Sequence, residues 1–195
     1  MPPKIKITKE DIVNAAVELV RSGGPCAVNA RALAAKLNCS TQPIFSNFAT
    51  MEELENAVIA AAHERYLSRL DAEAAQGLYP PYKAFGMAYV RFAREEKELF
   101  RLLFMRDRSG CDISASVDFE KSVGMIAAAN GISRERAELM HLEMWTCVHG
   151  IGTMLATSFL SLDEQLISDM LTDLYQGLRA RHLLKEEREN GCNKD

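Results

Sequence analysis

The chain has 195 residues, 48% hydrophobic and 26% charged, and a formal net charge of −4, as is typical of a globular protein with a substantial core. No apolar run approaches the roughly 18 residues of a membrane-spanning helix, and the opening sequence MPPKIKITKED lacks the apolar segment of a secretory signal. We therefore expect a cytoplasmic protein with no membrane partner, whose five scattered cysteines are reduced.

The charge is unevenly distributed along the chain. Residues 1–50 contain six Lys or Arg and three Asp or Glu, a net charge of +3, which leaves −7 for residues 51–195 (−4 minus +3). A basic first part on an acidic remainder favours nucleic-acid binding at one end, although ordinary scatter also produces such a difference. Residues 1–7 resemble a flexible arm in which Lys4 and Lys6 either reach DNA phosphates or serve solubility alone.

The first helix has a clear beginning and end. Thr8 and Asp11 form a capping box, which predicts a helix that continues to about Ser22. The sequence Gly23-Gly24-Pro25 then ends it. Its expected buried residues are Ile12, Ala16, Leu19 and Val20.

Two short helical segments follow between residues 29 and 48, with a tight corner between them. Asn29 is a good N-cap for the first, and Asn38 accepts the left-handed backbone that a sharp corner needs. We expect Ser40 to cap the second helix and Pro43 to lie in its first turn. The first segment repeats apolar residues at helical spacing: Ala30, Leu33, Ala34 and Leu37.

The second of these helices has two different faces. Ile44 and Phe48 are four residues apart and face inward, whereas the outward positions are polar and uncharged. This pattern predicts a helix-turn-helix that binds double-stranded DNA. Gln42 is suited to pair with adenine, while Arg31, Lys4 and Lys6 are suited to the phosphate backbone and the helix N-terminus at Ser40 to a phosphate. The residues expected to face the major groove are Thr41, Gln42, Ser46 and Asn47.

Further helices are predicted along the rest of the chain. Thr50 and Glu53 form a second capping box, which opens a helix that extends to about Ala75. The sequence from Gly77 to Pro81 breaks the chain, and the charged run 94–98 indicates a bend between two helices.

The last part of the chain follows the same pattern. Residues 106–112 are loop-like, and the next helices are expected over about 114–129, 133–158 and 161–184, the last opened by a capping box of Ser161 and Glu164. Residues 186–195 are charged and expected to fray. No stretch alternates as a strand does, so we predict an all-α protein of about nine helices. Its expected divisions are a helix-turn-helix domain at 1–54, a helical body at 55–187 and a tail at 188–195.

The last two long helices carry more apolar surface than one neighbour can cover. The helix over 133–158 is apolar on nearly every side, and such a helix must be covered on nearly every side. Either the chain itself or a second copy provides that cover, and we predict a homodimer. The residues expected at its interface are Gly152, Ala156, Ile167, Met170, Leu171, Leu174 and Leu178.

Large aromatic and thioether side chains are concentrated in the body of the chain. Such side chains suit a deformable apolar pocket, although at helical spacing they also form plain core. We expect a small, mostly apolar effector, with Tyr89 or His149 as its polar anchor. The candidate lining is Phe85, Tyr89, Phe92, Phe104, Met105, Met125, Met144, Trp145 and His149.

Signals of enzyme chemistry are weak. Glu138 and His141 have the spacing of a di-iron helix, but no second copy of that motif occurs, and His141 and His149 are too far apart to share a metal unaided. We therefore predict no catalytic site, no metal and no cofactor. Cys26, Cys39 and Cys147 are either thiol sensors or small buried hydrophobes.

The first part of the chain resembles the N-terminal domain of the TetR family of transcriptional regulators. This chain has Asn38 at the usual turn glycine, Phe45 at a tyrosine that touches phosphate, Asn47 at a histidine and Met51 at a lysine. Trp145-x-x-x-His149-Gly150 also resembles a signature in the C-terminal domain of one TetR subgroup. The matching residues are Ile12, Ala15, Ala16, Leu19, Gly23, Leu33, Ala34, Ser40, Phe45, Phe48, Glu52, Glu53 and Leu54.

The resemblance implies a homodimeric repressor that dimerises through its last two long helices and releases a palindromic operator when an effector binds. It also implies that Phe45 lies at the DNA. The departures from the family pattern leave open a helical dimer or adaptor that has lost specific DNA binding. An unrecognised helical enzyme is a separate alternative.

Overall fold

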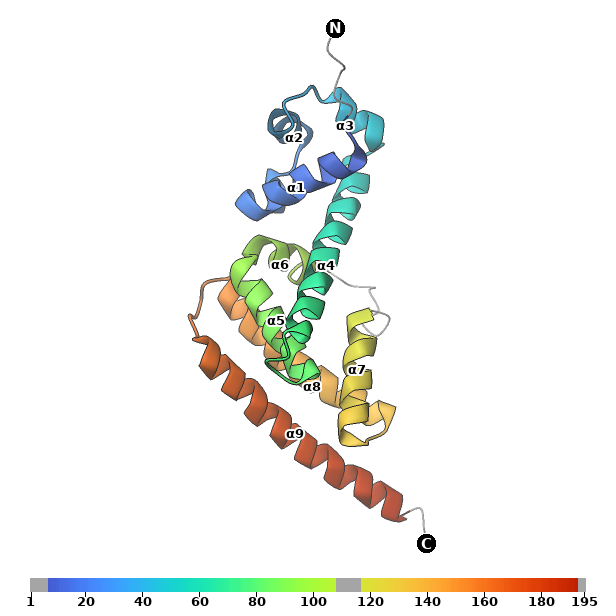
Figure 1. Ribbon diagram of the computed structural model, residues 1–195. Helices are drawn as coiled ribbons and strands as arrows, with labels where there is room; N and C mark the ends of the chain where they lie inside the picture. Colours follow the sequence, from blue (N-terminus) through green and yellow to red (C-terminus); the bar gives the residue numbers. More distant parts are fainter. Residues whose placement is uncertain (1–6, 108–116, 193–195) are drawn as a thin grey trace. The chain divides into compact units, whose positions relative to one another are not determined.

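The computed structural model describes residues 7–107 and 117–192, and within these ranges the chain forms nine α-helices and one 3₁₀-helix, with no strand (Figure 1). This confirms the predicted all-α fold. No helix of the described ranges is both long and apolar enough to cross a membrane.

The helices pack into two compact units. Unit 1 comprises Met1–Tyr66 and Glu95–Arg106, and unit 2 comprises Leu67–Arg94 and Asp107–Asp195. The boundary between the units therefore falls inside helix α4 (Met51–Ala75). These units are defined by packing, and the predicted functional divisions at 1–54, 55–187 and 188–195 remain a prediction.

Helix α1 (Lys9–Gly23) of unit 1 begins and ends where its sequence indicates. The Asp11 N–H donates to Thr8 Oγ1 at 3.1 Å and the Thr8 N–H donates to Asp11 Oδ2 at 2.9 Å, which is the predicted capping box. Gly24 ends the helix with φ +76°, and a Cβ there would lie 3.0 Å from Glu98 Oε2, so both backbone and space require glycine. Ile12, Ala16 and Val20 are buried as predicted, but Leu19 is only half-buried.

Helices α2 (Ala30–Lys36) and α3 (Gln42–Asn47) form the two arms of the predicted corner, after a 3₁₀ turn at Pro25–Ala27. Asn29 Oδ1 accepts from the Ala32 N–H at 2.9 Å, and Asn38 has φ +51°, both as predicted. The predicted cap at Ser40 is wrong, because α3 begins at Gln42 with Thr41 at the N-cap and no side-chain bond there. Every residue from Asn38 to Thr41 except Cys39 is a good cap former, so propensity could not select between them.

Helix α4 and the bend before α6 also follow the sequence. The Glu53 N–H donates to Thr50 Oγ1 at 3.1 Å, and the helix ends at Ala75 as expected. Glu96 interrupts the helical backbone between α5 (Pro81–Glu95) and α6 (Lys97–Phe104), which confirms the predicted bend. The buried residues of α4 recur every three or four positions as one stripe: Leu54, Val58, Ala62, Tyr66, Leu70 and Glu73.

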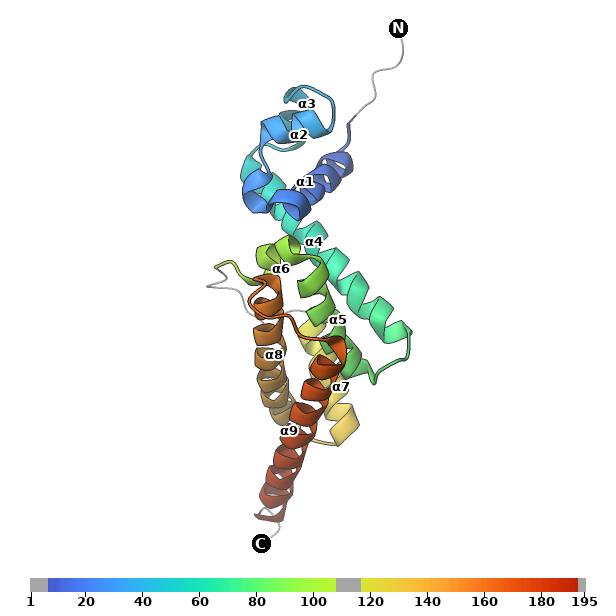
Figure 2. The same ribbon diagram turned by 90° about the vertical axis from the view of Figure 1, so that its left-hand side faces the viewer.

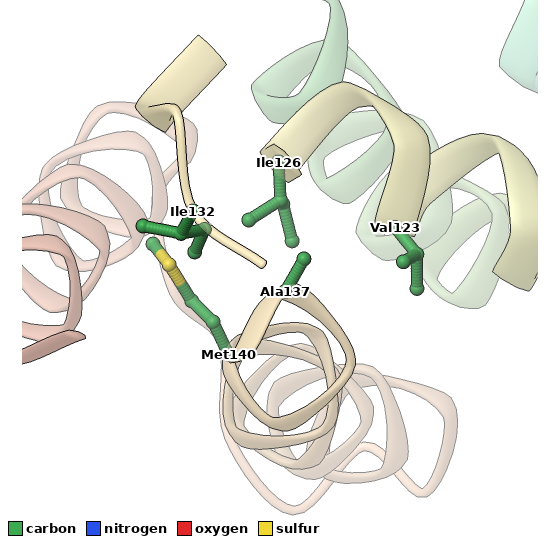
Figure 3. Packing of buried hydrophobic residues seen from close by; sticks show 5 residues of the cluster. All are labelled: Val123, Ile126, Ile132, Ala137 and Met140. Atoms are coloured by element: carbon green, nitrogen blue, oxygen red, sulfur yellow. The ribbon is translucent and has the colours of Figure 1, made fainter. Parts of the chain in front are cut away.

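Unit 2 is built from α5, α7 (Val117–Asn130), α8 (Arg134–Ala156) and α9 (Glu164–Cys192), with α8 and α9 side by side (Figure 2). One part of its core joins α7 to the start of α8 (Figure 3). Gly86 allows α5 to approach its neighbours closely, because a Cβ there would lie 3.3 Å from Leu171 Cδ1 and 3.8 Å from Val148 Cγ2. The core residues between α7 and α8 are Val123, Ile126, Ile132, Ala137 and Met140.

The limits of α9 correct two sequence-based predictions. The Leu166 N–H donates to Asp163 Oδ1 at 2.8 Å, so Asp163 caps the helix and the predicted box of Ser161 and Glu164 is wrong. The helix also continues to Cys192 instead of ending near 184. Glu186 accepts from the Ser133 N–H at 3.2 Å, a tertiary bond that no local pattern reveals. The predicted loop at 106–112 and helix start at 114 lie largely outside the described residues.

Candidate functional site

The outer face of α3 is the first candidate site. Ile44 and Phe48 are buried, as predicted, so the helix packs through that side. Gln42, Phe45 and Ser46 are exposed on the opposite side, and the Phe45 side chain is 53% exposed. The face therefore presents an amide, a hydroxyl and a phenyl ring without a formal charge.

Ser40 and Thr41 precede this helix in different roles from those expected. Ser40 is exposed and caps nothing, while Thr41 is half-buried at the N-cap. Because α3 has only six residues, its aligned peptide dipoles are few. The phosphate contact expected near Ser40 stays a prediction, and the helix start that was to support it lies at Gln42 instead.

Asn47 does not lie free on the outer face, contrary to expectation. Its half-buried amide donates to the Pro43 carbonyl at 2.7 Å and to the Ile7 carbonyl at 3.4 Å. Ser46 Oγ donates to the Gln42 carbonyl at 2.9 Å, which leaves its oxygen lone pairs available. Among the described residues the Gln42 amide has no hydrogen-bond partner, so it is the group on this face most available for base recognition.

The cations of unit 1 divide into engaged and unengaged groups. Lys9 forms an ion pair with Glu53 at 2.9 Å, and Arg21 binds both Glu18 and Glu96. Arg31 and Lys36 of α2 are exposed, and within the described ranges neither forms an ion pair. The sequence analysis selected Arg31 and did not select Lys36, although the sequence already placed Lys36 in the last turn of the same helix. Lys4 and Lys6 lie outside the described residues.

A second candidate site lies between α5 and α8 of unit 2. The Tyr89 hydroxyl lies 2.8 Å from His149 Nδ1, and the Trp145 ring stacks on His149 with a centroid distance of 5.0 Å and an interplanar angle of 16°. Tyr89 is buried, whereas Trp145 and His149 are half-buried. The structure thus joins three of the residues that we expected at an effector site, in one polar and aromatic contact.

The remaining candidate residues of that site are dispersed. Phe85, Phe92 and Met144 are buried core residues of unit 2, and Met125 is half-buried there. Phe104 and Met105 belong to unit 1 instead, where Phe104 packs against Tyr66 and Phe100 and Met105 is 40% exposed. Helical spacing indicated that these side chains lie in a pocket or a core, but not in which of the two units.

A second tyrosine–histidine pair joins the same two helices about two turns away from the first, and the sequence analysis did not predict it. The Tyr82 hydroxyl lies 2.9 Å from His141 Nδ1, with Phe119 against the same imidazole ring. Burial raises the pKa of Tyr82 and lowers the pKa of His141 to about 4. The phenol therefore donates and the neutral imidazole accepts. The sequence did contain one indication of this pair. Tyr82 and Tyr89 are seven residues apart and His141 and His149 are eight apart, so a tyrosine and a histidine each recur after about two helical turns.

The predicted dimer residues need correction. Gly152, Ala156, Ile167 and Leu171 are buried within the single chain, so they cannot present a surface to a second copy. Leu174 and Leu178 are half-buried, and Met170 is exposed. Because α8 is apolar on nearly all sides, its sequence could not show which side the chain covers. The exposed large apolar residues of α8, α9 and their connection are Leu139, Leu142, Met154, Phe159, Leu160, Leu166, Met170 and Leu184.

The side chains that suggested other chemistry have structural partners. His141 binds Tyr82, and Glu138 forms an ion pair with Arg134. Across the described part of the chain no three His, Cys, Asp or Glu side chains gather as a metal would require. Cys26, Cys39 and Cys147 are free thiols, and burial raises the pKa of Cys147, which disfavours its reactive thiolate.

Comparison with known proteins finds one matching family model in the second half of the chain and several solved structures of similar fold. Residues 82–175 match the family of tetracyclin repressor-like C-terminal domains. A protein with unknown function from Rhodococcus sp. RHA1 shares the fold at 19% identity and a TM-score of 0.73, over 92% of this chain and all (100%) of its own. A TetR-like transcriptional regulator from the same organism aligns at 16% identity and a TM-score of 0.65, over 90% of this chain and 96% of its own.

A third solved structure with this fold is the multidrug binding protein EbrR complexed with imidazole. It is 19% identical, with a TM-score of 0.59, over 85% of this chain and 88% of its own. No curated protein matches the sequence. Residues 82–175 therefore belong to the family of tetracyclin repressor-like C-terminal domains, and the whole chain, with a helix-turn-helix in unit 1, has the all-α fold of these solved structures.

Proposed function

We propose that this protein is a cytoplasmic homodimeric repressor that binds a palindromic DNA operator and releases it when a small, mostly apolar effector binds. The observation that carries the proposal is the outer face of α3. Its exposed Gln42 amide has no partner among the described residues. Arg31 and Lys36, which form no ion pair within the same ranges, lie on the neighbouring helix α2. Base-reading groups beside backbone-binding cations are what a helix in the major groove requires.

The two kinds of contact have different energetic signatures. A glutamine bound to the N6 and N7 edge of adenine contributes roughly 1–3 kcal/mol of discrimination. A cation at a phosphate instead contributes affinity for every sequence, and each such contact adds about 0.9 to the slope of log K against log salt. Gln42 should therefore set specificity, while Arg31 and Lys36 should set the salt dependence.

A gel-shift experiment tests this function. Operators would first be selected from genomic fragments, and binding would then be measured over a range of salt concentrations. Gln42→Ala should relax the preference at one base pair of each half-site, and Arg31→Ala and Lys36→Ala should each weaken all sequences and flatten the salt slope. Gln76→Ala and Lys185→Ala alter exposed residues of unit 2 and provide matched controls.

A second candidate function is a helical dimer or adaptor without specific DNA binding. Two observations favour it: the Asn47 amide is engaged inside unit 1, and Phe45 has no hydroxyl to donate to a phosphate. The same experiment separates the two functions. An adaptor would select no operator, and Gln42→Ala would leave any residual binding and its salt dependence unchanged.

The exposed apolar residues of α8 and α9 support the dimer. Leu142 on α8 and Met170 on α9 are exposed, and the two helices run side by side (Figure 2). A Cβ added at Gly150 or Gly177 would meet nothing within 4 Å, so both glycines allow a second chain to approach the backbone closely. A second copy packed on these helices would cover side chains that a monomer leaves in water.

The contact of Tyr89, Trp145 and His149 supports an effector site in unit 2. Stacked rings and one hydrogen-bonding pair would hold a flat, mostly apolar molecule with one polar group. EbrR, which has the same fold, is a multidrug binding protein. Helix α4 enters both units, so it is the element through which a bound effector would favour the state that releases DNA.

Trp145 provides the test of the effector site because it is the only tryptophan in the chain. A compound that releases operator DNA should change Trp145 emission and raise the thermal midpoint. Tyr89→Phe should weaken that response without preventing operator binding. A releasing compound that leaves both the emission and the midpoint unchanged would place its site elsewhere.

A further inference from the structure

Phe45 is the one large apolar side chain exposed on α3. Its ring is 53% exposed, whereas Ile44 and Phe48 of the same segment are buried. A single exposed apolar residue is ordinary on a protein surface and by itself indicates nothing. Its neighbours give it meaning, because it lies three residues after Gln42 and therefore on the same side of the helix.

The chemistry of the phenyl ring restricts what it can contact in DNA. It carries no donor and no charge, so it cannot form a hydrogen bond or an ion pair with a phosphate. In the major groove the apolar group available to a hydrocarbon is the 5-methyl of thymine, since the other base edges present donors and acceptors. Contact with any other base would leave polar groups desolvated against the ring.

The spacing relates this contact to the one expected from Gln42. Three residues of helix correspond to a rise of about 4.5 Å, which is close to the roughly 3.4 Å step between bases on one strand. Gln42 and Phe45 are therefore spaced to contact the same base pair or adjacent base pairs. We propose that Phe45 is a specificity residue that contacts the 5-methyl group of a thymine, next to or within the A·T pair that Gln42 reads.

This inference rests on the proposed DNA-binding function and names the base that its site selects. It predicts an A/T step in each half-site, with the thymine methyl recognised apart from its hydrogen bonds. Arg31 and Lys36 would hold the backbone on either side without contributing to that choice.

Replacement of thymine by deoxyuridine tests the inference, because it removes the methyl group and preserves base pairing. Each thymine of the selected operator would be replaced in turn and the dissociation constant measured by fluorescence anisotropy. A lost methyl contact of about 0.8 kcal/mol weakens wild-type binding about fourfold at one thymine position per half-site. Phe45→Ala should show no loss at that position, whereas Phe45→Leu, which keeps a hydrocarbon, should retain most of it.

The controls distinguish a failure of this inference from a failure of the proposed DNA-binding function on which it rests. Phe45 is exposed, so circular dichroism should show that both variants keep the fold, and Gln42→Ala should preserve the sensitivity to the methyl group. Wild-type binding that is insensitive to every deoxyuridine, or equal sensitivity in Phe45→Ala, would overturn the role of Phe45 while the DNA-binding function stands. Failure to select any operator would overturn both.

Discussion

Two tyrosine–histidine hydrogen bonds join α5 to α8 two helical turns apart, and their histidines have different surroundings. His149 is half-buried beneath Trp145, where a ligand could compete for its partner Tyr89. His141 accepts from Tyr82 and lies against Phe119, next to the core cluster of α7 and α8. The first pair therefore suits recognition, and the second is a structural contact that depends on a neutral imidazole.

The neutrality of His141 makes stability depend on pH. Its folded-state pKa of about 4 lies below the ordinary value of 6.5, chiefly because burial disfavours the charged form. Between pH 6.5 and pH 4 the imidazole is therefore protonated in the unfolded chain and neutral in the folded chain. The stabilisation is complete above pH 6.5 and is lost as the pH falls towards 4. Over that window we expect wild type to lose roughly 3 kcal/mol of unfolding free energy more than His141→Gln, which can still accept from Tyr82.

Urea unfolding at several pH values between 7 and 4 measures that difference. His63→Gln, which removes a half-buried histidine from unit 1, is the control for the loss of an imidazole. If wild type and His141→Gln lost stability in parallel as the pH fell, the His141 imidazole would not be the cause.

At the scale of elements, Arg91 holds α5, the last part of α4 and the start of α9 together within unit 2. Its guanidinium on α5 binds Glu73 of α4 and Glu164 at the start of α9. Glu73 is buried, whereas Glu164 is half-buried and has its pKa lowered by the hydrogen bond from Arg91. The buried Glu73 carboxylate therefore depends on this one guanidinium far more than the half-buried Glu164 carboxylate does.

Loss of the Arg91 charge should lower the unfolding free energy of unit 2 by more than the loss of its partner Glu164 does. Arg91→Met keeps the apolar stem but leaves the Glu73 carboxylate buried without its cation, which costs about 3–5 kcal/mol. Adding Glu73→Leu should restore most of that loss, and Glu164→Ala alone should cost under about 1 kcal/mol. Thermal or urea unfolding at pH 7 measures all three, and additive effects of the Arg91 and Glu73 substitutions would show that the two side chains are not coupled.

The limits of the helices show which features a sequence can predict. The caps at Thr8 and Asn29 and the left-handed Asn38 were predictable, because each rests on the chemistry of a few adjacent residues. The starts of α3 and α9 were misplaced, because several cap formers stand in succession and tertiary packing selects one of them. The Tyr82–His141 pair joins residues 59 positions apart, which no local pattern encodes.

The candidate site follows the same division. Exposure of Gln42 and burial of Ile44 follow from helical periodicity and were predicted. The engagement of Asn47 was not, because its second acceptor, the Ile7 carbonyl, belongs to a segment 40 residues earlier. Polar residues on one helix face resemble one another in sequence, and only the packed chain shows which have already found partners.

At the scale of the whole molecule, the proposed assembly depends on the exposed apolar side chains of α8, α9 and their connection. Phe159 in the connection between these helices is 75% exposed, and Leu142 on α8 is 50% exposed. A homodimer would cover these side chains and would place two copies of α3 on one operator. Operator affinity should therefore depend on residues that never touch DNA.

Charge introduced on this surface should separate the two copies. We expect Met170→Glu and Leu142→Glu each to give a monomer by light scattering and to weaken operator binding by two orders of magnitude or more, roughly the loss of one half of a bivalent contact. Both side chains are exposed in the single chain, so its fold should persist. Leu78→Glu, at a 68% exposed position in the connection between α4 and α5, is the matched control and should remain dimeric. An unmodified protein that is monomeric in solution would contradict this assembly.

The bond from Asn47 to the Ile7 carbonyl limits the reach of the preceding lysines. Ile7 is held beside α3, and an extended chain advances at most about 3.6 Å per residue. In the proposed complex with DNA, the chain that precedes Ile7 is therefore attached beside the α3 of its own copy, and the two half-sites are about 34 Å apart. Lys4→Ala and Lys6→Ala should accordingly weaken each half-site equally and leave the preferred spacing between half-sites unchanged.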